Sequence, residues 1–241
     1  MILWRYAVAA QELLRLASQT RLKAVHVIST LSVFSEPPSD QPLPEIMEVP
    51  IGADGLHGGY PQTKWVAERI AAAAGTKQWL IILCAVYFLL VLLCFLFLSI
   101  WTAARGLPVH IYRPGRITGP TGIGAMNTED FTSRFLKGCI QLQAAPVLPG
   151  ALLDFSPVDV CADVIVSCVR RHRFGAYHIF NPTLARWDVV VGAMRKFGFP
   201  MRWMPYKEWA ALLRERLEGN ALQPLLPLLS EEGLTAPHRY E

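Results

Sequence analysis

Apolar and polar positions in the first third of the chain predict a helix that leads into a buried strand. Apolar residues recur at helical spacing over residues 5–20, with polar side chains on the opposite face. Residues 24–30 form a short apolar run rich in β-branched residues, which is typical of a strand covered on both faces. A helix followed directly by such a strand is typical of a parallel α/β unit.

The pattern then changes twice before further helices and strands follow. Residues 36–58 contain five prolines and three glycines, which predicts a long exposed loop, and residues 60–74 are almost all helix formers. After residue 105, the pattern of apolar and polar residues predicts a strand at 106–112, helices at 131–142 and 160–171, a strand at 176–181, and helices at 187–197 and from Tyr206. The leucine- and proline-rich end carries no clear prediction.

Residues 79–101 are the most apolar part of the chain. These 23 residues carry no charge, have a tryptophan at each end, and lie between Lys77 and Arg105. As a helix they would span roughly 34 Å, enough for a bilayer core, and their ends match interfacial anchors. We therefore predict a transmembrane helix here in preference to a buried core helix, which rarely lacks a polar face.

The apolar segment also interrupts a connection that is normally a few residues long. Residues 76–104 separate the helix of Lys64 from the strand at 106–112, so we predict that they are an insertion. Two origins are open: a translated intron or misjoined gene model, and a genuine membrane anchor. A real membrane crossing would leave Tyr60 and Arg113 on opposite sides of the bilayer.

Composition narrows the functional classes. Hydrophobic residues make up 52% of the chain and charged residues 17%, and the net charge of +4 comes from dispersed Lys and Arg, so nucleic-acid binding is not indicated. Five cysteines without a C-x-x-C pair predict a reducing compartment, and six histidines without ligand spacing predict no metal site. No G-x-S-x-G elbow is present, which argues against the corresponding esterases.

Candidate chemistry lies at the start of the helix predicted for residues 60–74. Tyr60 and Lys64 are four residues apart, which places both on one helix face. A free phenol loses its proton near pH 10, and a nearby ammonium favours the phenolate and makes the phenol a usable acid. Thr30 ends the predicted strand, where ligands of open parallel sheets bind. A solvated helix face and a turn-capping threonine are the simpler alternatives.

Six stretches taken together resemble one enzyme family. They are VHVISTLSV (25–33), GYPQTKWVAE (59–68), VHIYRPGRITG (109–119), PVD (157–159), YHIFN (177–181) and PYKEW (205–209). In this order they resemble the thioester reductase branch of the extended short-chain dehydrogenase/reductases. That branch includes reductase domains of nonribosomal peptide and polyketide synthetases, aminoadipate reductases and carboxylic acid reductases.

The resemblance implies a fold and an activity. The fold would be α/β, with an incomplete Rossmann-like doubly wound parallel sheet in residues 1–118 and a smaller α+β substrate lobe in residues 119–241. The activity would be NADPH-dependent reduction of an acyl thioester to an aldehyde or alcohol. The acyl group would be bound to the phosphopantetheine arm of an acyl-carrier or peptidyl-carrier protein.

Residue roles follow from the same resemblance. Tyr60 would donate a proton to the developing oxyanion, and Lys64 would hold the nicotinamide ribose and lower the pKa of the tyrosine. Thr30 would donate a hydrogen bond to the substrate carbonyl. The run Arg113, Pro114 and Gly115 would pack beside the nicotinamide.

Two departures from the family leave the activity open. The family's sheet opens with a strand and a glycine-rich turn that holds the cofactor pyrophosphate. The amino end of this chain offers no such turn, which predicts a truncated domain with doubtful cofactor binding. The second departure is the insertion at 76–104. The sequence therefore also allows a membrane-anchored noncatalytic remnant, a carrier-protein-binding module, or another extended short-chain dehydrogenase acting on a small carbonyl, a steroid or a sugar nucleotide. We expect a membrane location if 79–101 spans a bilayer and a cytoplasmic one otherwise.

Overall fold

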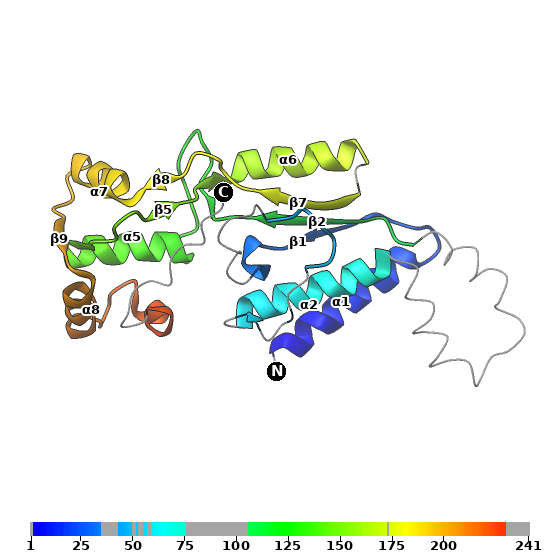
Figure 1. Ribbon diagram of the computed structural model, residues 1–241, viewed down its shortest axis with the longest axis horizontal. Helices are drawn as coiled ribbons and strands as arrows, with labels where there is room; N and C mark the ends of the chain where they lie inside the picture. Colours follow the sequence, from blue (N-terminus) through cyan, green and yellow to red (C-terminus); the bar gives the residue numbers. More distant parts are fainter. Residues whose placement is uncertain are drawn as a thin grey trace, which may run out of the picture. The chain divides into compact units, whose positions relative to one another are not determined.

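The protein divides into two units. The structure, a computed structural model, describes residues 2–34, 43–49, 52, 55–56, 59–75, 106–172 and 174–229. Unit 1 comprises Met1–Gly115 and Asp163–Ile179, and unit 2 comprises Arg116–Ala162 and Phe180–Glu241 (Figure 1). The chain therefore passes between the units three times, whereas the sequence predicts a single boundary after residue 118.

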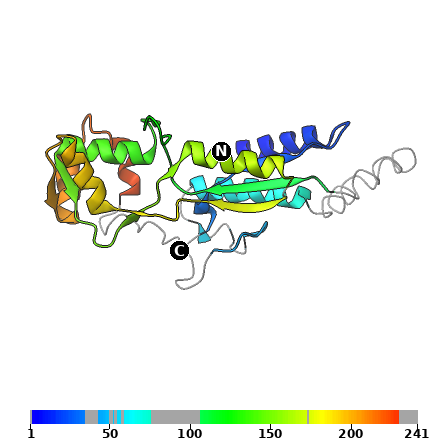
Figure 2. The ribbon, with the colours of Figure 1, turned by 90° about the horizontal axis from the view of Figure 1, so that it is seen from above.

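Unit 1 is built around a parallel sheet with the strand order β1-β2-β7. The strands are β1 (Val25–Ile28), β2 (Val109–Pro114) and β7 (Gly175–Ile179). On one face of the sheet lie α1 (Ile2–Ser18) and α2 (Gly59–Gly75), and toward the other lies the end of α6 (Val158–Arg170) that belongs to this unit (Figures 1 and 2). This Rossmann-like arrangement confirms the predicted α/β class.

The position of each strand in the sheet decides how far it is buried. Strand β2 lies between two partners and is buried along its whole length, and its Val109 and Ile111 form one apolar cluster with Ala71 of α2. Strand β1 has one partner in the described sheet, and its Ile28 is 44% exposed. Residues of β1 alternate between half-buried and exposed, so the prediction of a strand covered on both faces is wrong for β1; β-branched composition does not distinguish a strand with one open face from one covered on both.

The described part of unit 2 packs short helices and strand pairs around an aromatic core. Its helices are α5 (Phe131–Leu142), α7 (Trp187–Lys196), α8 (Tyr206–Glu215) and the 3₁₀ helix η3 (Gln223–Leu228). Its strands pair as β3 (Ile117–Thr118) with β6 (Ser156–Pro157), β4 (Ala144–Pro146) with β9 (Arg202–Met204), and β5 (Leu152–Leu153) with β8 (Ala185–Arg186). Two of these pairs are parallel and the third is antiparallel.

Helix α5 has the bounds that the sequence predicts, because both of its ends are capped locally. The Asp130 side chain accepts a hydrogen bond from the Ser133 amide at 2.7 Å, as expected of an N-cap. At the other end Gln143 takes a left-handed backbone conformation with φ of 51°, which stops the helix.

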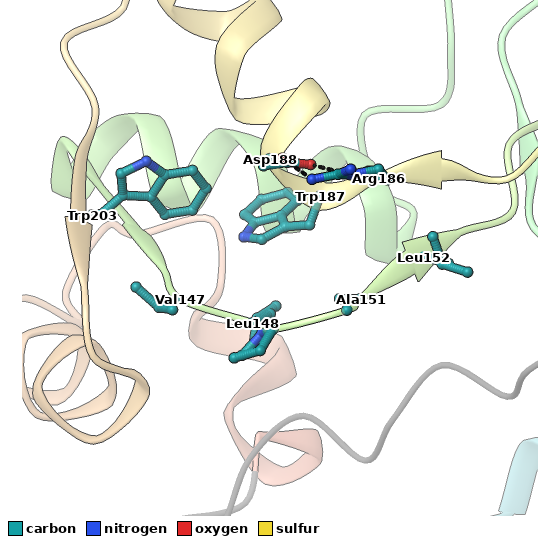
Figure 3. Close-up of a pocket in the computed structure, with 10 residues that line it drawn as sticks. Val147, Leu148, Ala151, Leu152, Arg186, Trp187, Asp188 and Trp203 are labelled. Atoms are coloured by element: carbon teal, nitrogen blue, oxygen red, sulfur yellow. Dashed lines mark hydrogen bonds and ion pairs between the residues drawn. The ribbon is translucent and has the colours of Figure 1, made fainter.

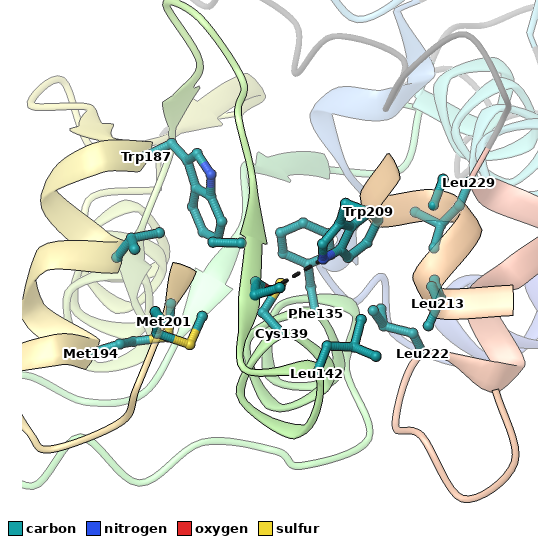
Figure 4. Close-up of a cluster of buried hydrophobic side chains, with 14 residues drawn as sticks. Phe135, Cys139, Leu142, Trp187, Met194, Met201, Trp209, Leu213, Leu222 and Leu229 are labelled. Carbon is teal, nitrogen blue, oxygen red and sulfur yellow. Dashed lines mark hydrogen bonds between the residues drawn. The ribbon is translucent and has the colours of Figure 1, made fainter. Parts of the chain in front are cut away.

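Tryptophans dominate the core of unit 2 (Figure 4). Trp209 and Trp187 are buried beside Phe135, and each indole N–H has a backbone acceptor. The Trp209 indole donates to the Ala144 carbonyl at 3.2 Å and the Trp187 indole to the Pro146 carbonyl at 2.8 Å. These contacts satisfy the polar edge of both rings while their apolar area is buried.

The predicted transmembrane helix falls on residues 79–101, and the whole predicted insertion at 76–104 lies outside the described residues. Within the described ranges, no helix is both long and apolar enough to cross a membrane.

Candidate active site

The candidate active site of unit 1 lies where β1 ends and α2 begins. The Lys64 Nζ donates a hydrogen bond to the Ile28 carbonyl oxygen at 3.0 Å. The same Nζ lies 5.9 Å from the centroid of the Tyr60 ring. The Lys64 ammonium therefore links Tyr60 to the end of β1, which is a tertiary contact that a purely solvated helix face would lack.

Tyr60 is the most accessible member of this group. It stands in the first turn of α2 and is 61% exposed, so its phenol can meet a ligand that arrives from solvent. Among the described contacts, none joins Tyr60 or Lys64 directly to Thr30. The structure brings Tyr60 and Lys64 together and holds Thr30 two residues beyond the Ile28 carbonyl that Lys64 binds.

Thr30 caps a turn at the end of β1. It is the N-cap of the 3₁₀ helix η1 (Leu31–Val33), and its Oγ1 accepts a hydrogen bond from the Ser32 amide at 3.2 Å. The hydroxyl donates in turn to the Ser32 Oγ at 3.3 Å. The capping alternative for Thr30 is thus realised in the structure. A catalytic role is still compatible with this cap. The Ser32 amide fixes the Thr30 oxygen, while the Thr30 hydroxyl can rotate its proton from the Ser32 Oγ to another acceptor.

Arg113 is completely buried and makes a two-point ion pair with Glu68 of α2. Its Nη2 donates to the Glu68 Oε2 at 2.8 Å, and its Nε donates to Oε1 at 3.0 Å. The guanidinium carbon lies 5.1 Å from the centroid of the Phe34 ring. The predicted contact of Arg113 with nicotinamide stays a prediction, as do those of Pro114 and of Gly115, whose amide donates to the Ile179 carbonyl at 2.8 Å.

A histidine completes the surroundings of Arg113. The His178 Nε2 lies 3.4 Å from an Arg113 Nη1, and the His178 amide donates to the Glu45 carboxylate at 2.7 Å. Burial, aided by the Arg113 charge and opposed by Glu45, lowers the pKa of His178 to about 4. The imidazole is therefore neutral at physiological pH and can accept a hydrogen bond from Arg113.

The sequence does not single out Glu68 or His178 as residues of this site. Glu68 continues the four-residue spacing of Tyr60 and Lys64, so helical periodicity alone could have placed it on their face. His178 has no comparable signal, because its contact with Arg113 joins residues 65 positions apart.

The glycine spacing of a dinucleotide-binding turn does occur in the chain, in a different place. Gly52, Gly55 and Gly58 have the pattern G-x-x-G-x-x-G, and they directly precede α2 instead of following a first strand. A Cβ added at Gly52, the first glycine of the pattern, would meet nothing within 4 Å. The spacing alone therefore does not identify a phosphate-binding turn here.

The side chains at the α2 end of the site fit the sugar end of a nicotinamide dinucleotide. A lysine has three N–H donors, and one of those on Lys64 goes to the Ile28 carbonyl, so the ammonium can still bind ribose hydroxyl groups. Tyr60 adds an exposed phenol beside it. In the described part of the chain, no cluster of three or more His, Cys, Asp or Glu residues could hold a metal ion.

Unit 2 contains a separate pocket of about 690 Å³ with largely apolar walls (Figure 3). The loop from Val147 to Leu152 forms one wall, and Trp187 and Trp203 lie opposite it. At its edge Arg186 and Asp188 form an ion pair with contacts of 2.6 and 3.0 Å. No motif in the sequence predicts this pocket, because its walls come from segments more than 30 positions apart.

Comparisons with known proteins agree on one family. The model of a NAD-binding family described as "Male sterility protein" matches residues 5–85 and 99–165. Among solved structures, the terminal R domain from the myxalamid PKS-NRPS biosynthetic pathway is 35% identical with a TM-score of 0.73, and the match covers 95% of this chain and 52% of that one. Aldehyde reductase lnbA of Aspergillus flavus is 31% identical over 240 residues, covering 90% of this chain and 20% of the relative.

A third similar protein is the large subunit of L-2-aminoadipate reductase from Eremothecium gossypii. It is 31% identical over 197 residues, which cover 79% of this chain and 12% of the relative. The chain thus spans about half the length of the solved R domain and a fifth or less of these two curated relatives.

Proposed function

The chain belongs to the NAD-binding family of thioester reductase domains, a branch of the extended short-chain dehydrogenase/reductases, and we propose that it takes part in the NADPH-dependent reduction of a carrier-bound acyl thioester. The observation that carries this proposal is the Lys64 ammonium, which binds the end of β1 and lies beside the exposed Tyr60 ring. This arrangement puts a proton donor and a cation at the sheet edge where ligands of parallel α/β folds bind.

Three side chains carry the chemistry in this proposal. NADPH, when bound, would supply the hydride for this reduction. The Tyr60 hydroxyl donates a proton to the carbonyl oxygen as negative charge develops there, and the Lys64 ammonium stabilises the resulting phenolate. The Thr30 hydroxyl turns from the Ser32 Oγ to the same oxygen and donates a second hydrogen bond. The hydroxyl formed on the thioester carbon then returns its proton to the Tyr60 phenolate as the carbon–sulfur bond breaks, the thiolate leaves with the carrier, and the product is an aldehyde.

The substrate in this proposal is an acyl or peptidyl group bound through phosphopantetheine to a carrier protein. The similar R domain comes from a PKS-NRPS biosynthetic pathway, and the resemblance described in the sequence analysis implies a carrier-bound acyl thioester. We assign recognition of the acyl group to unit 2, because its pocket is largely apolar and is large enough for an aliphatic or aromatic chain.

The test measures NADPH binding and NADPH oxidation by the full 241-residue chain with an acyl-pantetheine thioester. A version that lacks residues 76–104 is measured beside it. We expect Tyr60→Phe to lower kcat by about 10²–10⁴-fold, as removal of a general acid does. Lys64→Met should lower kcat and also raise the KM for NADPH, whereas Lys137→Met, at an exposed position of α5 in unit 2, should leave both unchanged.

Two results would contradict the proposal. Full activity of Tyr60→Phe would show that another group donates the proton. Failure of both the full chain and the shortened version to oxidise NADPH, with both folded, would favour the noncatalytic alternatives.

A further inference from the structure

The face of α2 that carries Tyr60 and Lys64 continues one turn further to Glu68. Residues four apart on a helix share a face, and here the last two of the three bond to different strands. Lys64 reaches the Ile28 carbonyl of β1, and Glu68 reaches Arg113 of β2. Two polar contacts therefore fix the rotation of α2 and its position along the sheet.

Arg113 also contacts the segment that holds Thr30. Its guanidinium packs on the Phe34 ring, and the Phe34 amide donates to the Leu31 carbonyl at 3.1 Å and closes η1. Thr30 caps the other end of the same turn. One side chain thus touches both segments that carry the predicted catalytic residues.

Stability alone does not explain an ion pair in this position. The side chains of Arg113 and Glu68 are 0% and 2% exposed, and the removal of two charges from water offsets much of their attraction. Apolar side chains of similar volume would hold α2 as firmly. A guanidinium that binds both carboxylate oxygens adds a fixed distance and direction, so the pair is suited to orienting one element against another.

The charge of Glu68 also bears on Lys64. The two residues lie one turn apart on the same face, within reach of an i, i+4 ion pair. Arg113 engages both Glu68 oxygens, and Lys64 keeps its contacts with Ile28 and Tyr60. Without Arg113, the Glu68 carboxylate would draw Lys64 away from those contacts.

We propose that Glu68 and Arg113 are positioning residues of the candidate active site. They set α2 against the turn that holds Thr30, and they leave the Lys64 ammonium directed at Tyr60. The inference rests on the proposed function, since positioning affects turnover only if these three side chains act on a substrate.

The test compares Arg113→Met with the double variant Glu68→Gln/Arg113→Met in the full-length chain. Arg69→Met is the matched control, because Arg69 also lies on α2 and forms an ion pair with Glu48, but that pair is exposed. Steady-state kinetics give kcat and KM, and amide hydrogen exchange followed by mass spectrometry reports on residues 30–34 and, as a reference in unit 2, on α5.

For Arg113→Met we expect kcat to fall about 10–100-fold with the thioester KM within about threefold, because the reacting groups are displaced but still present. Exchange at residues 30–34 should be at least about tenfold faster, with α5 unchanged. The double variant should recover about tenfold in kcat, because no unpaired carboxylate competes for Lys64. Arg69→Met should match the unmodified chain in every measurement.

Two results would overturn the inference: unchanged exchange at residues 30–34 in Arg113→Met, or a double variant no faster than Arg113→Met. If the unmodified chain shows no reductase activity, the proposed function fails while the exchange measurement still decides whether Arg113 orders the Thr30 turn. If Arg113→Met does not fold, Arg113→Lys replaces it, since it keeps the charge and loses the two-point contact. Faster exchange at residues 30–34 then supports the inference, and unchanged exchange contradicts it.

Discussion

The two units of the chain bury different kinds of side chain. Unit 1 buries both members of an ion pair, which joins Glu68 of α2, the helix that carries Tyr60 and Lys64, to Arg113 of β2. The main core of unit 2 consists of aromatic and aliphatic side chains around Trp187 and Trp209. Directional bonds hold side chains at set distances, whereas apolar contacts scale with buried area and tolerate rearrangement. The interior of unit 1 therefore combines apolar packing with an ion pair suited to orientation, whereas the main core of unit 2 is apolar.

The difference concerns the buried ion pair, because unit 2 also contains buried polar side chains, among them a cluster around Asp154. The Asp154 carboxylate accepts from the Arg116 amide at 3.0 Å, the Ser156 hydroxyl at 2.7 Å and the Asn181 amide at 3.1 Å. The donors belong to loops and to the two-residue strand β6, so the carboxylate joins backbone segments that have little or no strand pairing of their own. Polar burial around Asp154 thus joins loops in unit 2, whereas the buried ion pair of unit 1 joins α2, the helix of the candidate site, to β2.

The largest effect should come from the aromatic core of unit 2. We expect Trp209→Ala to lower the free energy of unfolding by about 3–5 kcal/mol, because the indole is fully buried and its removal leaves a cavity. Trp203→Ala is the control, since Trp203 is 39% exposed, and it should lower this free energy by no more than about 1 kcal/mol. Urea unfolding followed by circular dichroism measures both. Equal losses for the two tryptophans would show that burial in the aromatic core of unit 2 does not decide their contribution to stability.

A smaller effect should follow from overpacking the same core. A Cβ at Gly138 of α5 would lie 2.5 Å from the Leu222 Cγ, in the buried interior. We expect Gly138→Ala to lower the free energy of unfolding by about 1–3 kcal/mol. Gly192→Ala in α7 is the matched control, because nothing lies within 4 Å of its added Cβ, and it should raise this free energy by about 0.5–1 kcal/mol. Thermal unfolding measures both. If Gly138→Ala raised the free energy of unfolding, the core beside Leu222 would have room for the added methyl group.

The smallest effect belongs to unit 1 and depends on pH. The pKa of His178 is about 4 in the folded chain and near 6.5 in an unfolded one. Its contribution to stability is complete above pH 6.5, and it is lost as the pH falls toward 4, because only the unfolded chain then takes up the proton. The loss should be about 1–2 kcal/mol, since solvent screens the half-buried ring.

The variant His178→Gln tests this pH dependence, because its amide oxygen can still accept from Arg113 but does not titrate. Urea unfolding between pH 7 and 4 should show a shallower decline for this variant than for the unmodified chain. An identical decline in both would show that another group causes the pH dependence. It would also contradict a lowered pKa of His178 in the folded chain.

Much of the secondary structure could be predicted because its signals are local. Helix α5 has the predicted bounds since Asp130 and Gln143 cap its ends within a few residues. Helix α7 was expected over 187–197 and ends at Lys196. The prediction of full burial is wrong for β1, because the sequence of a strand does not say whether other elements cover both of its faces.

The sequence by itself determined that Tyr60 and Lys64 share a face of one helix, because that relation depends only on helical geometry over four residues. It also determined the family, because several short stretches in a fixed order carry the resemblance. Only the tertiary structure decided that Lys64 bonds to Ile28, 36 positions away, and that Glu68 bonds to Arg113, 45 positions away. Such contacts depend on how the chain returns to its own sheet, which local propensity and periodicity do not encode.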